Sequence, residues 1–127
     1  MGKYGETALL AVKLIESKQA ATPREAWKKA SAEIFSAGSS KDKDCPRSTF
    51  LGLCEEDLVR GITRGKYTTS LKSKSYAIQG VELLKQDPSF TKSPLSLWKA
   101  ICADKVYNSQ MDVVISLWEN NYIVKKR

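Results

Sequence analysis

Residues 111–119 of the chain are MDVVISLWE, a stretch in which apolar side chains occupy most positions. A helix formed here would be apolar around most of its circumference, and such a helix is stable only when other elements surround it. The apolar side chains that follow Met111 are Val113, Val114, Ile115, Leu117 and Trp118. We therefore predict a central helix from Met111 to about Glu119, capped by Asn108, with the rest of the protein packed around it.

Five further segments show the three-to-four-residue spacing of apolar side chains that is typical of amphipathic helices. They span about 5–19, 22–38, 45–59, 73–86 and 93–102. A polar stretch at 38–44 separates the second from the third and predicts a solvated loop. The chain is too short for a second core. The pattern thus predicts an all-α fold, a compact single-domain bundle of about six helices over 1–127.

Two helix starts carry strong local signals. Thr22, Pro23 and Glu25 supply an N-cap hydroxyl, a proline at the first helical position and a carboxylate that can reach back to the cap. Ser93 and Pro94 repeat the first two of these features. At the other end of the chain, residues 122–124 either continue the last helix or form a short extended tail, and we find no strand that could pair with them.

The charge balance and the cysteines bear on the partner and on the compartment. Lys and Arg outnumber Asp and Glu by 21 to 14, a net charge of +7 that favours anionic partners. Three cysteines cannot all pair within one chain, which indicates a reducing compartment. The N-terminal stretch lacks the pattern of an export signal, and no run approaches the ~20 apolar residues of a membrane span. We expect a cytoplasmic protein without membrane contact.

The segment CPRSTFLGLCEEDLVRGI at 45–62, followed by the helix start Ser75-Tyr76-Ala77, resembles a family of small uncharacterised bacterial proteins. The resemblance covers about the first two thirds of the chain. It implies a bacterial, cytoplasmic origin and carries neither an activity nor a functional residue to this sequence.

The composition argues against most catalytic and metal chemistry. Histidine is absent, which removes the usual general base and the commonest transition-metal ligand. No CxxC pair exists for zinc, and Gly61 and Gly65 have the wrong spacing for a phosphate loop. We therefore expect no cofactor and no metal, and assign no catalytic residue. Cys45 is either a reactive thiol at a helix start or a packed one, and we expect 55–57 to form a solvated acidic face.

The segment from Arg60 to Lys74 is the candidate functional site. It contains no acidic residue, and hydroxyl side chains alternate with its cations, a combination that suits phosphate oxygens. Tyr67 could stack on a base. The candidate site residues for an anion or nucleic acid are Arg60, Arg64, Lys66, Tyr67, Lys72 and Lys74.

Three hypotheses follow for the function. The leading one is a small intracellular binding protein that contacts an anionic partner, nucleic acid foremost, through this basic turn. The second is a protein-interaction or adaptor domain without a nucleic-acid role, which docks through the last helix or the tail at 122–127. The third is a histidine-free enzyme. The basic turn could also be no more than a solvated connector between two helices.

Overall fold

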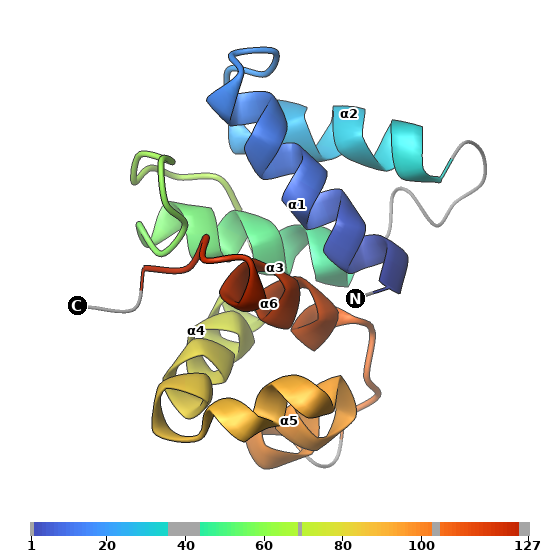
Figure 1. Cartoon of the computed structure of the whole chain (residues 1–127), viewed down its shortest axis with the longest axis vertical. Coiled ribbons are helices and arrows are strands. Elements are labelled where there is room, and N and C mark those ends of the chain that lie inside the picture. Colours follow the sequence, from blue (N-terminus) through green and yellow to red (C-terminus); the bar gives the residue numbers. More distant parts are fainter. Residues whose placement is uncertain (1, 36–43, 69, 103–104, 125–127) are drawn as a thin grey trace.

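The computed structural model of the chain describes residues 2–35, 44–68, 70–102 and 105–124. Within them lie six α-helices and one short 3₁₀ helix (Figure 1). The helices are α1 (Gly2–Glu16), α2 (Pro23–Ile34), α3 (Asp44–Glu55), α4 (Leu71–Gln86), η2 (Pro88–Lys92), α5 (Pro94–Ile101) and α6 (Gln110–Glu119). The prediction of an all-α fold with about six helices is confirmed. None of the described helices is long and apolar enough to cross a membrane.

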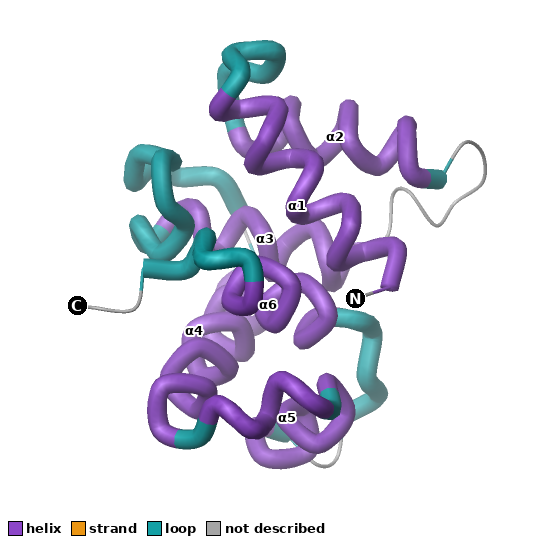
Figure 2. The backbone as a smooth tube through the Cα atoms, in the orientation of Figure 1, coloured by secondary structure: helices purple, strands orange, loops and turns teal. Residues whose placement is uncertain are grey.

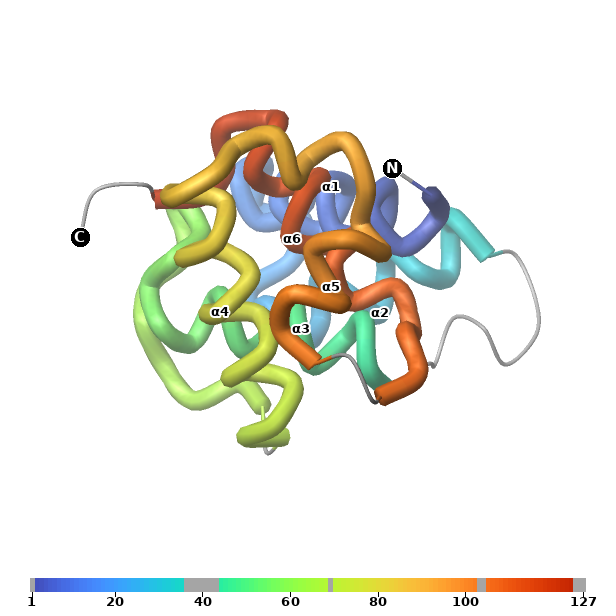
Figure 3. The backbone as a smooth tube through the Cα atoms, turned by 90° about the horizontal axis from the view of Figure 1, so that it is seen from below, coloured from blue at the N-terminus to red at the C-terminus, as the bar shows by residue number. Residues whose placement is uncertain are grey.

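Helix α6 is the centre of the structure, as its apolar sequence predicts. It packs against α1, α3, α4 and α5, and it lies between α1 and α5 in Figures 1 and 3. Eight of its ten residues are buried, from Gln110 and Met111 to Trp118. Burial of α6 therefore ties four helices together.

A second group of large buried side chains pairs Trp27 of α2 with Phe50 of α3, whose ring centroids are 5.4 Å apart.

The predicted starts of α2 and α5 are confirmed. The Thr22 hydroxyl accepts a hydrogen bond from the Glu25 amide at 3.1 Å, and Glu25 accepts one from the amide of Ala21 at 2.7 Å. At α5, the Ser93 hydroxyl accepts from the Ser96 amide at 3.1 Å. These bonds satisfy amides that have no partner inside the helix.

Other predicted boundaries differ from the structure. Asn108 is not the cap of α6, because the N-cap position belongs to Ser109, whose φ of 65° gives it a left-handed backbone. Helix α4 begins at Leu71, earlier than predicted, because Ser70 caps it. The predicted end of the second helix at Gly38 lies outside the described residues.

Helix α3 ends at Glu55, four residues before the predicted end at residue 59. The chain that follows the helix is therefore free to pair with the C-terminal tail. At Asp57 the backbone turns into the left-handed region, with φ 62°, so Leu58 and Val59 are buried outside the helix. Val59 forms an isolated antiparallel bridge with Ile123, so the tail pairs with the chain at one point, although the described residues contain no strand. The short extended tail itself is present and lies beside the loop that joins α3 to α4 (Figure 2).

Two glycines let helices approach closely. A Cβ atom on Gly52 of α3 would lie 2.8 Å from the Cα atom of Lys74 on α4, closer than real Cβ atoms come. On Gly5 of α1 it would lie 2.1 Å from the hydroxyl oxygen of Ser116 on α6. Both helix pairs therefore pack backbone to backbone at these points.

The contact at Gly52 predicts a steep cost for one added methyl group. Gly52→Ala should lower the free energy of unfolding by about 1–3 kcal/mol, the usual range for overpacking, because its neighbour is backbone and cannot rotate away. Gly80→Ala is the matched control, since its Cβ atom would meet the flexible side chain of Met111. Urea denaturation measures both, and equal stability of the two variants would contradict this account.

Candidate anion-binding surface

The segment 60–74, hereafter the basic turn, contacts one buried carboxylate through two backbone amides and one side chain. Glu55 at the end of α3 accepts hydrogen bonds from the amides of Tyr67 at 2.8 Å and Thr68 at 3.2 Å. Its second oxygen lies 2.6 Å from the ammonium of Lys74. The expected solvated acidic face was therefore wrong for Glu55, which is buried because it binds the returning chain.

Lys74 is occupied within the protein. Its ammonium lies 2.6 Å from carboxylate oxygens of both Glu55 and Glu56, and its side chain is only 19% exposed. The hydrogen bond from Lys74 lowers the pKa of Glu55 to about 2, and the amides of Tyr67 and Thr68 act in the same direction against desolvation. The two carboxylates in turn raise the pKa of Lys74, Glu55 more than Glu56. Lys74 adds little positive potential to the surface, because two negative charges surround it.

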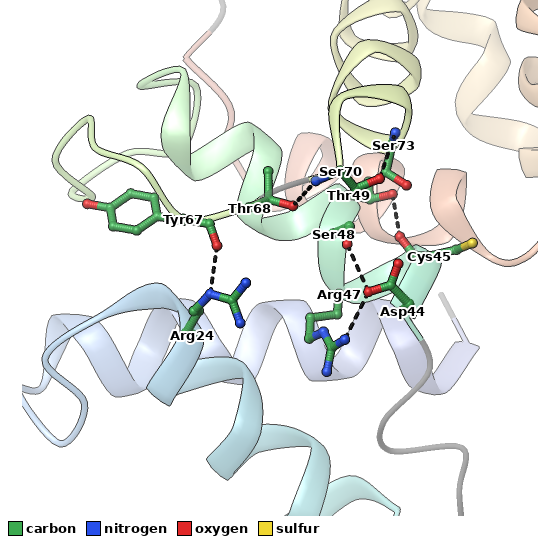
Figure 4. A network of polar contacts seen from close by, with 10 residues as sticks. All are labelled: Arg24, Asp44, Cys45, Arg47, Ser48, Thr49, Tyr67, Thr68, Ser70 and Ser73. Carbon is green, nitrogen blue, oxygen red and sulfur yellow. Dashed lines mark hydrogen bonds and ion pairs between the residues drawn. The ribbon is translucent and has the colours of Figure 1, made fainter.

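Tyr67 is also committed to internal contacts. Its hydroxyl donates to the carbonyl of Thr63 at 2.6 Å, and its half-buried ring packs against the core. Its carbonyl accepts a hydrogen bond from Nε of Arg24 at 2.8 Å, which joins the turn to α2 (Figure 4). Stacking on a base would require the ring to leave this position.

The remaining predicted residues do not line a common cavity. Arg60, Arg64 and Lys66 are exposed, and none of them lines a described cavity. Arg60 lies beside the tail, since its amide donates to the carbonyl of Tyr122 at 2.7 Å. Lys72, by contrast, lines a cavity at the start of α4. The structure does not gather the six predicted residues into one concave site.

A stronger concentration of positive charge lies between α2 and α3. A groove with a volume of about 580 Å³, hereafter the basic groove, is lined by four cations and one carboxylate. Its lining residues are Arg24, Glu25, Lys28, Lys29, Ala32 and Arg47. Figure 4 shows Arg24 of α2 directed at the carbonyl of Tyr67 and Arg47 of α3 directed at Asp44. The groove was not predicted from the sequence, although the spacing of Arg24 and Lys28 places them on one helix face.

The charges of the basic groove are only partly neutralised. Lys29 lies 3.6 Å from Glu25, and Arg47 lies 2.9 Å from Asp44. Arg24 and Lys28 form no ion pair with a described carboxylate. These two side chains therefore keep their positive charge uncompensated at the surface.

A second cavity adjoins the groove at the Asp44–Arg47 ion pair. This cavity, hereafter the α3–α4 pocket, has a volume of about 380 Å³ and lies at the start of both helices. It is lined by Asp44, Cys45, Ser70, Lys72, Ser73, Tyr76, Trp98, Lys105, Val106, Asn108 and Gln110. Cys45 lies here, half-buried, with its sulfur 3.9 Å from the side-chain nitrogen of Asn108.

Metal ligands are not gathered anywhere in the part of the chain that the structure describes. No group of three Cys, Asp or Glu side chains there could hold a metal ion.

The position of Glu55 predicts a pH-dependent stability. Its pKa is lowered from 4.5 to about 2, so the stability it contributes is present above pH 4.5 and is lost as the pH falls toward 2. Glu55→Gln should cost about 1–3 kcal/mol at pH 7, because buried donors lose their charged acceptor. Between pH 4.5 and 2 the difference between the wild-type protein and the variant should shrink.

Urea denaturation at several pH values measures this difference. Glu25→Gln is the matched control, because Glu25 is exposed and its pKa is lowered chiefly by the amide of Ala21. A stability gap between wild type and Glu55→Gln that stays constant over the whole range would contradict the role of this carboxylate.

Comparison with known proteins places the chain in a family. The model of a family of unknown function, DUF6979, matches residues 1–124, which extends well beyond the segment on which the resemblance was based. No curated protein and no solved structure matches the chain. Because the match covers nearly the whole sequence, the chain belongs to DUF6979, a family of unknown function.

Proposed function

We propose that the protein binds a polyanion, nucleic acid foremost, with the basic groove as the main contact. The observation that carries this proposal is the lining of the groove, which contains four cations and only one carboxylate. Phosphate backbones bind to such surfaces because each contact with Lys or Arg releases condensed counterions. The proposal keeps the anionic partner expected from the sequence and moves its main contact from the basic turn to α2 and α3.

The geometry of the two arginines supports phosphate binding. Nε of Arg24 is held by the carbonyl of Tyr67, and one terminal nitrogen of Arg47 is held by Asp44. Each guanidinium is thereby oriented and retains further N–H groups for an anion. Lys28 adds a third charge to the lining of the groove and pairs with no described carboxylate. Such preorganised donors lose less side-chain entropy when they bind.

The positive surface extends from the groove in two directions. Across the Asp44–Arg47 ion pair it reaches the α3–α4 pocket with Lys72. Across the bond between Arg24 and Tyr67 it reaches the basic turn with Arg64 and Lys66. An extended chain of phosphates suits such a surface better than a single small ion. Because these contacts involve no base edges, we expect binding with little sequence preference.

Charge removal in the groove tests the proposal. The triple variant Arg24→Gln, Lys28→Gln and Arg47→Gln should bind a fluorescein-labelled 20-nucleotide DNA more weakly than the wild type, measured by fluorescence anisotropy. The slope of log affinity against log salt should fall by about 0.7 for each phosphate of single-stranded DNA that the variant no longer neutralises. Thermal unfolding of the variant checks that the fold is retained.

A control with the same change in net charge separates the groove from overall charge. Lys13, Lys92 and Lys99 are exposed and line none of the described cavities. Their triple substitution by Gln should leave most of the affinity and of the salt slope in place. Equal losses in both triple variants, or wild-type protein that does not bind at low salt, would refute the proposal.

A second candidate function, binding to another protein, is favoured by a different observation. Leu71 and Val106 are 74% and 81% exposed, which is unusual for large apolar side chains. Leu71 and Ile78 also line a hollow of about 230 Å³ on α4. The partner surface expected from the sequence was wrong for α6, which is buried.

The double variant Leu71→Ser and Val106→Ser tests this candidate. It should lose partners that wild type captures from a nuclease-treated lysate, identified by cross-linking and mass spectrometry, and it should keep its DNA affinity. A partner set that is unchanged by these substitutions would argue against this surface.

A further inference from the structure

We propose that the α3–α4 pocket binds a small molecule that joins an anionic group, carboxylate or phosphate, to a planar aromatic group. This inference does not depend on polyanion binding in the basic groove. It rests on three features of the pocket: an aromatic wall, two ammonium groups that pair with no carboxylate among the described residues, and a glutamine side chain whose nitrogen donates to no described residue.

The aromatic wall is formed by α4 and α5. The rings of Tyr76 and Trp98 meet edge to face, with their centroids 5.1 Å apart and their planes at 82°. The indole nitrogen of Trp98 donates to the carbonyl of Lys105 at 3.0 Å. That bond satisfies the polar atom of the indole and holds the chain at Lys105 against α5. Trp98 is only 2% exposed and supports the half-buried ring of Tyr76, which is the part of the wall that a ligand can reach.

The cationic side of the pocket is formed by Lys72 and Lys105. Neither ammonium pairs with a carboxylate among the described residues. Asp44 is the acidic lining residue, and it is already bonded to Arg47 at 2.9 Å and to Ser48 at 3.3 Å. Helix α4 begins at the same place, and its N-terminal amides also favour a negative charge. An anionic group near Lys72 would meet all of these donors.

Gln110 supplies the observation that points to a ligand independently of charge. It is only 4% exposed, and its side-chain oxygen accepts a hydrogen bond from the amide of Asn108 at 2.8 Å. Because a backbone amide donates only to an acceptor, this bond shows which end of the Gln110 amide is the oxygen and which is the nitrogen. No described residue accepts a hydrogen bond from its nitrogen, although Gln110 lines the pocket. This nitrogen is not one of the fully buried polar atoms without a partner, so it is open to the pocket and can donate to a ligand oxygen.

The size of the pocket limits the ligand. Its volume of about 380 Å³ is close to the lower end, roughly 300 Å³, of sites that hold small organic ligands. One aromatic ring system with one anionic group fits this volume. A mononucleotide carries phosphate and an indole acid carries carboxylate, so the two represent the two sources of the anion.

The test uses the full chain and four probes. Adenosine monophosphate and indole-3-acetate carry both groups, whereas adenosine lacks the anion and inorganic phosphate lacks the ring. Calorimetric titration should show binding of at least one of the first two probes, at least tenfold tighter than adenosine and phosphate. Binding of adenosine monophosphate would identify the anionic group as phosphate, and binding of indole-3-acetate would identify it as carboxylate. In the Cys102→Ser background, the bound probe should slow alkylation of Cys45, which lines the pocket, while buried Cys54 stays unreactive.

Variants separate the pocket from other surfaces. Lys72→Gln with Lys105→Gln should weaken the binding probe at least tenfold, and Gln110→Leu should weaken it without changing the charge. The control pair Lys92→Gln and Lys99→Gln removes the same charge from surfaces outside the pocket and should leave the affinity unchanged.

Two results would overturn this inference. One is that neither aromatic anion binds or protects Cys45 at millimolar concentration. The other is that the pocket pair and the control pair weaken binding equally. Failure of the groove proposal is distinguishable with the double variant Arg24→Gln and Lys28→Gln, which leaves Arg47 paired with Asp44, changes no residue that lines the α3–α4 pocket and should retain small-molecule binding.

Discussion

Helix α6 has too few polar positions to leave any broad face in water, and the packing of the other helices follows from this constraint. Four helices cover it: α1, α3, α4 and α5. The close approach of α1 is permitted by Gly5, where even a methyl group would collide with Ser116. Gly52 serves the same purpose between α3 and α4. Burial of one apolar helix thus brings α1, α3, α4 and α5 together, whereas α2 packs on α1 and α3 at the side of this centre.

Glu55 is the polar counterpart of this apolar centre. It lies where α3 ends and binds two amides of the returning chain together with the ammonium of Lys74. The same carboxylate therefore orders the basic turn and removes one of its cations from the surface. The tail adds a further restraint, since Ile123 pairs with Val59 directly before the turn. The basic turn is rich in cations and hydroxyl groups, and some of its polar groups are bound within the protein.

The exposed cations fall into two functional arrangements. In the basic groove, charges from α2 and Arg47 form an open surface suited to a chain of phosphates. In the α3–α4 pocket, Lys72 and Lys105 stand beside aromatic rings and a glutamine amide, which suits one small anion. The Asp44–Arg47 ion pair joins the two, since Asp44 lines the α3–α4 pocket and Arg47 lines the basic groove.

The sequence by itself determined the number of helices, the central place of the last one and the starts of α2 and α5, because periodicity and capping act over three or four residues. It also indicated a positively charged surface around Lys72. It could not indicate that Lys74 pairs with Glu55, 19 positions away, or that Arg24 holds Tyr67, 43 positions away. Only the tertiary structure decided which cations stay uncompensated, because ion pairing and cavity shape depend on side chains that folding brings together from distant parts of the chain.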